Sequence, residues 1–166
     1  MDNAKSIRLL NAGVADELQA VHQYMYWHFH LADQGFALFS ALFRRIAIQE
    51  MGHLEGLAER ILFLKGEVEM VAACPVVKIT ETESILAKAV QMENDGILAY
   101  NKAAIECAAN ADSSSKQLFE RMVKDEESHF DQFEKQRDHL KRFGPNYLAL
   151  QSFGGNVPET APEKAE

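Results

Sequence analysis

Four glutamates lie where apolar residues would be expected, each in the middle of a stripe with helical spacing. Within each half of the chain, 33 residues separate the first glutamate from the second, and a histidine follows three residues after the second. The repeated set is Glu17, Glu50 and His53 in the first half and Glu93, Glu126 and His129 in the second. A fold that accommodates this pattern has to bring negative charge into its interior twice.

Burying such carboxylates is unfavourable, because moving an ionised group out of water costs several kcal/mol unless the group is paired or binds a cation. The central parts of the stripes carry no Lys or Arg that could pair with them. One glutamate from each of two helices, with Glu-x-x-His from each of the two others, is the ligand pattern of di-iron and di-manganese sites in helical bundles. Carboxylates with one imidazole per metal suit iron or manganese, and zinc could also bind. The pattern therefore predicts a dinuclear metal site.

The first half of the chain is predicted to form a helical hairpin. Apolar residues at intervals of three and four indicate a helix over about residues 4–33. A break at Gln34-Gly35 leads to a second helix, whose stripe runs from Phe39 to Leu64 and which Gly66 ends. The short connection makes the two helices antiparallel neighbours.

The second half repeats this arrangement. Thr80 and Glu83 have the spacing of a capping box and are predicted to begin the third helix. The polar cluster 110–115 predicts a tight turn and supplies the cap of the fourth helix, which stops at Gly144-Pro145.

A segment without helical periodicity, residues 67–81, connects the two hairpins. About 15 extended residues reach about 50 Å and a helix of about 30 residues is about 45 Å long, so this segment can run the length of the bundle. We therefore expect an all-α fold: a four-helix bundle with one long crossover and a short C-terminal fifth helix at 146–153. Residues 1–153 are predicted to form one domain and residues 154–166 a flexible tail.

The composition argues against several classes of partner. The net charge of −8 and pI near 5.3 disfavour a nucleic-acid partner, since such surfaces are rich in Lys and Arg. No segment approaches the roughly 18 apolar residues that a membrane span needs, and the N-terminus lacks a secretory pattern. Cys74 and Cys107 form no thiolate metal site or disulfide framework, and their roles stay open. We expect a cytoplasmic protein with no membrane partner.

From Ile7 to about Phe153 the chain resembles the bacterioferritins. The resemblance rests on four runs of sequence, Glu17–Tyr24, Ile48–His53, Ala58–Leu64 and Asp125–His129. It implies a ferritin-like four-helix bundle with a ferroxidase centre inside each subunit.

All six candidate ligands match positions of that centre. The resemblance implies that two carboxylates bridge the metal ions and that each ion has a further glutamate and one histidine. The implied arrangement is Glu17 and His53 on one iron, Glu93 and His129 on the other, and Glu50 and Glu126 bridging them.

Two further residues receive roles from the resemblance. Met51 is implied to bind haem b or a related iron porphyrin at a two-fold subunit interface; it lies about 100° around the helix from Glu50 and so points away from the metal site. Packing in an apolar interface is the alternative role for Met51. Tyr24 is implied to donate a hydrogen bond to a ligand carboxylate, a role compatible with a place in the core.

The chain also departs from the family. Arg45 and Gln49 stand where some bacterioferritins have a histidine and an aspartate on the inner cage surface, and Leu57 and Gln132 stand where some have aromatic residues. Because of these departures, the resemblance does not imply an iron relay on the inner surface or aromatic electron donors in this chain. The remaining histidines, which lack partners at comparable spacing, are expected on the surface or in packing; they are His22, His28, His30 and His139.

The resemblance implies an iron-storage ferroxidase that oxidises Fe(II) with O2 or peroxide. It further implies storage of ferric mineral in a cage of 24 subunits built from two-fold dimers that share haem, and a small electron-donor protein for iron release. Two alternatives stay open: a rubrerythrin-like di-iron oxidase or peroxidase without mineral storage, and a non-enzymatic haem-carrying shell protein. The lack of a cysteine-rich rubredoxin-like domain argues against the first alternative.

Overall fold

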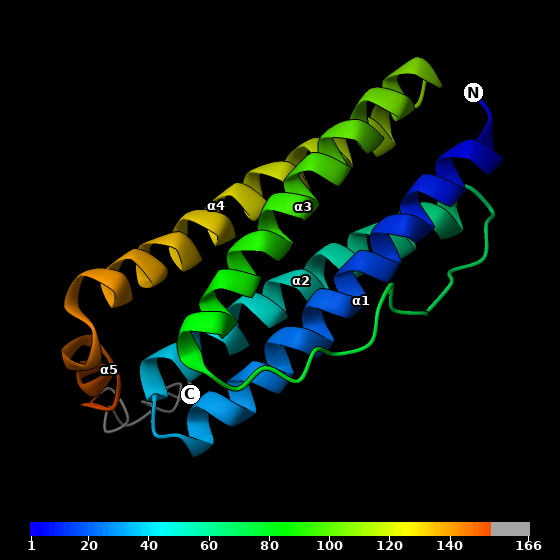
Figure 1. Ribbon diagram of the computed structural model, residues 1–166. Helices are drawn as coiled ribbons and strands as arrows, with labels where there is room; N and C mark the ends of the chain where they lie inside the picture. The colour runs from blue at the N-terminus through cyan, green and yellow to red at the C-terminus, as the bar shows by residue number, and fades with distance from the viewer. Residues whose placement is uncertain (154–166) are drawn as a thin grey trace, which may run out of the picture.

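The computed structural model describes residues 1–153, and five helices lie within them (Figure 1). They are α1 (Asn3–Asp33), α2 (Ala37–Phe63), α3 (Thr82–Ala109), α4 (Ser113–Phe143) and α5 (Pro145–Gln151). The predicted flexible tail, residues 154–166, lies outside the described residues. None of these helices has an apolar stretch long enough to cross a membrane.

The four long helices form two antiparallel hairpins, α1 with α2 and α3 with α4, that pack into a bundle (Figure 1). The first turn uses Gly35 at φ +83°, a conformation that glycine adopts without the steric cost paid by other residues. In the second turn the Asp112 side chain accepts a hydrogen bond from the Ser115 amide and so caps α4. Asp112 also forms an ion pair of 2.6 Å with Arg60 of α2, which ties the two hairpins together. The predicted all-α bundle is confirmed.

The crossover from α2 to α3 runs along α1 from one end of the bundle to the other, as the green trace in Figure 1 shows. Side chains of α1 hold its backbone. Gln23 both donates to the Val77 carbonyl and accepts from the Val77 amide, at 3.0 and 2.7 Å. The Trp27 indole donates to the Ile79 carbonyl, and Asn11 bonds the backbone near the start of the crossover. These bonds satisfy polar backbone groups that a long loop would otherwise leave unpaired.

The start of α3 differs from the prediction. The helix begins at Thr82, and its cap is Glu81, whose carboxylate accepts from the amides of Glu83 and Ser84. Thr80 does not cap, because the helix begins two residues later and Glu81 occupies the cap position; the Thr80 carbonyl instead accepts a hydrogen bond from Gln34. The predicted capping box is therefore wrong.

Helix α2 ends three residues before Gly66. Lys65, at φ +64°, takes the left-handed conformation of the turn. Gly66 serves a different purpose, because a Cβ at this position would lie 2.8 Å from the Ile7 Cδ1 atom. The glycine is needed for close approach of the crossover to α1. Helix α5 likewise spans Pro145–Gln151, slightly earlier than the predicted 146–153.

The apolar core consists of two clusters, one toward each end of the bundle. One is centred on Trp27, Phe43 and Phe133, and the other on Leu57 and Phe119. On every long helix the glutamate of the repeated pattern lies between a residue of one cluster and a residue of the other. The fold thus sandwiches one polar layer between two apolar ones.

The Gln23 bonds give a test of the crossover. Replacing Gln23 by Ala removes both hydrogen bonds to the Val77 backbone, which at about 0.5–1.5 kcal/mol for each bond should cost about 1–3 kcal/mol and lower the thermal midpoint by about 2–10 °C in calorimetry. Gln19→Ala on the same helix, where no hydrogen bond is lost, should leave the midpoint nearly unchanged. Equal midpoints for both variants would show that these bonds do not hold the crossover.

Candidate metal centre

The six residues of the repeated pattern meet at the middle of the bundle. Each long helix contributes one glutamate, and α2 and α4 each add a histidine one turn later. All are buried except His53, whose side chain is 11% exposed. Their ligand atoms form two groups, each with all atoms within 4.8 Å of one another. The groups are Glu17, Glu50, His53 and Glu126, and Glu50, Glu93, Glu126 and His129.

Both imidazoles turn Nδ1 toward the carboxylates. His53 Nδ1 lies 2.9 Å from Glu50, 3.2 Å from Glu126 and 3.5 Å from Glu17. His129 Nδ1 lies 3.1 Å from the other oxygen of Glu50 and 3.6 Å from Glu93. Despite these distances, neither Nδ1 atom nor either oxygen of Glu50 has an aligned hydrogen bond within residues 1–153. Buried polar atoms that crowd together without aligned hydrogen bonds are what a bound metal ion would satisfy, so the residues fit one.

Without metal, the two imidazoles supply the positive charge that the stripes lack. Burial opposes protonation of His129, but its contacts with Glu50 and Glu93 outweigh burial and raise its pKa to about 10. The pKa of His53 is raised as well, by contacts with Glu126, Glu17 and Glu50 that overcome burial. Burial raises the pKa of Glu50, but contacts with both histidines prevail and lower it to about 2. The absence of Lys and Arg therefore does not leave the carboxylates uncompensated.

Two other carboxylates of the cluster respond differently. Burial raises the pKa of Glu17 and of Glu126 well above the ordinary value, and the charge of Glu50 adds to the shift. The metal-free centre therefore holds protons on both imidazoles and favours them on these carboxyls. A metal ion that binds here has to displace protons, which couples its affinity to pH.

Two tyrosines hold carboxylates across the bundle. Tyr24 of α1 donates to Glu93 of α3, and Tyr100 of α3 donates to Glu17 of α1 at 2.6 Å. The Tyr24 hydroxyl thus contacts one of the four repeated glutamates. The role of Tyr100 was not predicted from the sequence, although Tyr100 follows Glu93 by seven residues, as Tyr24 follows Glu17. That matching interval was the signal that could have identified it.

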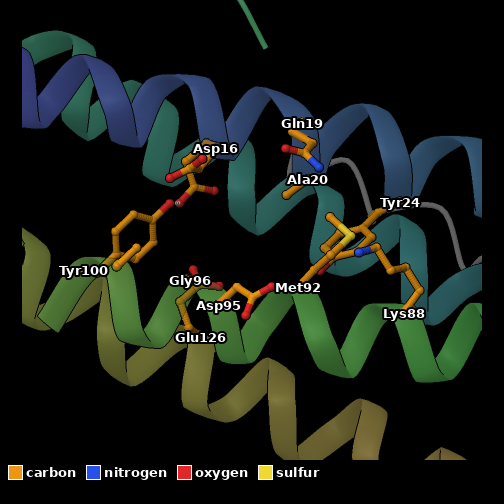
Figure 2. A pocket seen from close by; sticks show the side chains of 12 residues that line it. Asp16, Gln19, Ala20, Tyr24, Lys88, Met92, Asp95, Gly96, Tyr100 and Glu126 are labelled. Carbon is orange, nitrogen blue, oxygen red and sulfur yellow. Dashed lines mark hydrogen bonds between the residues drawn. The ribbon is translucent and has the colours of Figure 1, made fainter. Parts of the chain in front are cut away.

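A pocket of about 250 Å³ leads to the centre between α1 and α3. Figure 2 shows its lining, in which side chains of α1 and α3 face each other and Glu126 of α4 lies at the back. Gly96 lets the Glu126 side chain approach α3 closely, since a Cβ there would lie 3.3 Å from Glu126 Oε2. The exposed carboxylates Asp16 and Asp95 flank the opening. The centre is thus accessible from one face of the bundle.

The other sequence candidates lie away from this cluster. Met51 lies on α2 with 49% of its surface exposed, as expected for a residue that points away from the core. His28 bonds Ser40, and His139 contacts the aromatic rings of Phe143 and Tyr147, so these histidines serve packing. Both cysteines are free thiols.

The raised pKa of His129 predicts a pH dependence. A histidine whose pKa is raised by folding stabilises the protein below its ordinary pKa of 6.5, and this stabilisation is lost as the pH rises through the folded value of about 10. The thermal midpoint of the metal-free protein should therefore fall between pH 6.5 and 10. The increase in midpoint on adding Zn²⁺ should grow over the same range, because zinc then displaces fewer protons.

Two variants serve as references. His22→Gln, at an exposed position, should retain the fall, and His129→Gln should reduce it. A midpoint that is independent of pH in the wild-type protein would contradict the assigned charges.

Known proteins resemble this chain over most of its length. A family model described as a ferritin-like domain matches residues 7–143. The bacterioferritin of Desulfovibrio desulfuricans is 36% identical over 146 residues, covering 88% of this chain and 82% of that protein. The bacterioferritin of Rhodobacter capsulatus is 37% identical over 150 residues, covering 89% and 92%.

The fold agrees as well. A crystal structure of the D. desulfuricans bacterioferritin, described as showing its di-iron site in different catalytic states, superposes with a TM-score of 0.92 at 34% identity. The superposition covers 99% of this chain and 96% of that one. With this similarity in sequence and in fold, the chain belongs to the bacterioferritin family.

Proposed function

We propose that this chain is an iron-storage ferroxidase that oxidises Fe(II) to Fe(III) at its buried centre. The observation that carries the proposal is the pair of ligand groups that share Glu50 and Glu126. Cations that share carboxylates lie close enough to act together on one oxidant. Membership of the bacterioferritin family supports the same function.

The two groups suggest which residues bind each metal ion. Each proposed metal position has one glutamate and one histidine of its own, and the remaining two glutamates serve both. The proposed ligands are Glu17 and His53 for one ion, Glu93 and His129 for the other, and Glu50 and Glu126 for both.

Fe(II) is the substrate: two ferrous ions give up one electron each, so that O2 is reduced to H2O2, or H2O2 to water, with uptake of two protons. The carboxylates favour this oxidation, because added negative charge stabilises Fe(III) more than Fe(II). Tyr24 and Tyr100 orient Glu93 and Glu17 through their hydrogen bonds. The imidazoles give up their Nδ1 protons when metal enters, and the apolar clusters on either side exclude water.

The finer parts of the proposal concern assembly and haem. We place Met51 as an axial ligand of haem b or a related porphyrin at a two-fold subunit interface; its exposed thioether is free to reach such a group. We further propose a cytoplasmic cage of 24 subunits that stores ferric mineral and receives electrons for iron release from a small donor protein. The free thiols of Cys74 and Cys107 suit a reducing compartment.

Replacement of Glu126 by Ala tests the proposed oxidation. Anaerobic Fe(II) should saturate the wild-type protein at two ions per chain, one for each ligand group, and air should then produce rapid ferric absorbance. In Glu126→Ala, rapid oxidation should be lost while the assembly mass stays the same. Glu127→Ala, at the next and exposed position of α4, should behave like the wild-type protein. Wild-type protein that binds no Fe(II) would refute the proposal, and binding without oxidation would favour the non-enzymatic shell.

The assembly mass and the amount of retained ferric iron distinguish the proposed function from a rubrerythrin-like oxidase. The proposed function predicts the mass of a cage by gel filtration and many ferric ions retained per chain after repeated Fe(II) additions. A dimer that oxidises Fe(II) without retaining it would instead indicate a rubrerythrin-like oxidase.

Met51→Leu tests the haem assignment. Loss of the thioether should remove the visible absorption bands of the porphyrin, because leucine has no atom that can ligate iron. Met70→Leu changes another exposed methionine, in the crossover, and should leave the bands unchanged. Bands that persist in Met51→Leu would exclude Met51 as the ligand.

A further inference from the structure

One aspartate contacts the metal centre without belonging to either ligand group. Asp125 Oδ2 lies 3.2 Å from His53 Nε2, on the side of the ring opposite to the Nδ1 atom that faces Glu17, Glu50 and Glu126. The Asp125 side chain is 59% exposed, whereas that of His53 is 11% exposed. A carboxylate therefore reaches from the surface to the outer nitrogen of a buried ligand.

The internal repeat of the chain shows that this contact has no counterpart. Each residue of the centre recurs 76 positions later: Glu17 as Glu93, Glu50 as Glu126, His53 as His129 and Tyr24 as Tyr100. The same offset relates Asp125 to Gln49, a neutral and exposed residue.

The environments of the two histidines differ accordingly. The carboxylate contacts of His129 within residues 1–153 all run through Nδ1, to Glu50 and Glu93. No side chain in that range hydrogen-bonds its Nε2 atom, whereas His53 has Asp125 there. The ligand sets of the two halves are alike, and only one imidazole has a carboxylate behind it.

An imidazole can donate from one ring nitrogen and bind metal with the other, and the partner of the first decides which is which. Asp125 accepts the Nε2 proton of His53, which leaves the Nδ1 lone pair directed at the carboxylate cluster. A carboxylate partner also makes the imidazole a stronger donor and fixes the plane of its ring. Both effects act on His53 and are missing at His129.

We infer that Asp125 is a positioning residue that makes the two metal positions unequal, so that the group with His53 takes up a divalent cation before the group with His129. This inference rests on the proposed function, since it assigns the order in which the same centre fills. Partners of this kind are worth about 10–100-fold in metal affinity.

Cobalt(II) titration of the metal-free protein tests the inference without oxidation chemistry. Calorimetry and visible absorbance should resolve two binding steps in the wild-type protein. Asp125→Asn should weaken the first step about 10–100-fold and leave the second unchanged, so that the steps merge. Glu127→Gln removes the same charge from an exposed position on the same helix and should keep two separate steps.

Single-site backgrounds assign the steps to the positions. In Glu93→Ala only the group with His53 stays complete, and adding Asp125→Asn should weaken its cobalt binding. In Glu17→Ala only the group with His129 stays complete, and adding Asp125→Asn should have no effect. Circular dichroism of the metal-free variants checks that the fold is intact.

The outcomes separate this inference from the proposed function. Wild-type protein that binds two cobalt ions with equal affinity, or an Asp125→Asn variant that weakens binding equally in both backgrounds, overturns the positioning role and leaves the metal centre standing. Wild-type protein that binds no cobalt overturns both.

Discussion

The structure depends on a layer of buried carboxylates held at one level across four helices. Two apolar clusters, one toward each end of the bundle, could pack with many relative positions of the helices. The polar layer between them is less tolerant, because each carboxylate needs an imidazole, a tyrosine hydroxyl or a cation within reach. A helix that slipped by one turn would leave a charge in an apolar cluster. The costly layer thus fixes the register of the bundle.

The long crossover allows both hairpins to place their glutamates and histidines in this one layer. Two hairpins with equivalent ligands have to pack so that both sets meet, and the second hairpin must start at the far end of the first. A segment bound along α1 by Gln23 and Trp27 achieves this without unpaired backbone groups. The two tyrosine hydroxyls then link the hairpins at the centre itself, each holding a carboxylate of the opposite one. The fold and the site are therefore stabilised by the same contacts.

The two-fold repetition of the chain produces a centre whose two halves contain the same residue types but have unequal surroundings. Both imidazoles carry protons in the metal-free state, since buried carboxylates surround them. A metal ion that bound here would have to displace these protons. Asp125 contacts His53 on the side of the ring away from the cluster, and Gln49, the equivalent residue of the repeat, is exposed and neutral.

The sequence by itself indicated the four long helices, the long crossover and the six residues that the structure brings together. Apolar periodicity and a repeated Glu-x-x-His can be recognised along a single chain, because residues that are buried together recur at helical spacing. The sequence did not reveal the cap at Glu81, the close approach at Gly66 or the Asp125 contact. It also did not show that the histidines offset the carboxylates. These features were decided by the tertiary structure, because each depends on which atoms of different helices lie within a few ångströms, and spacing along one chain does not fix such distances.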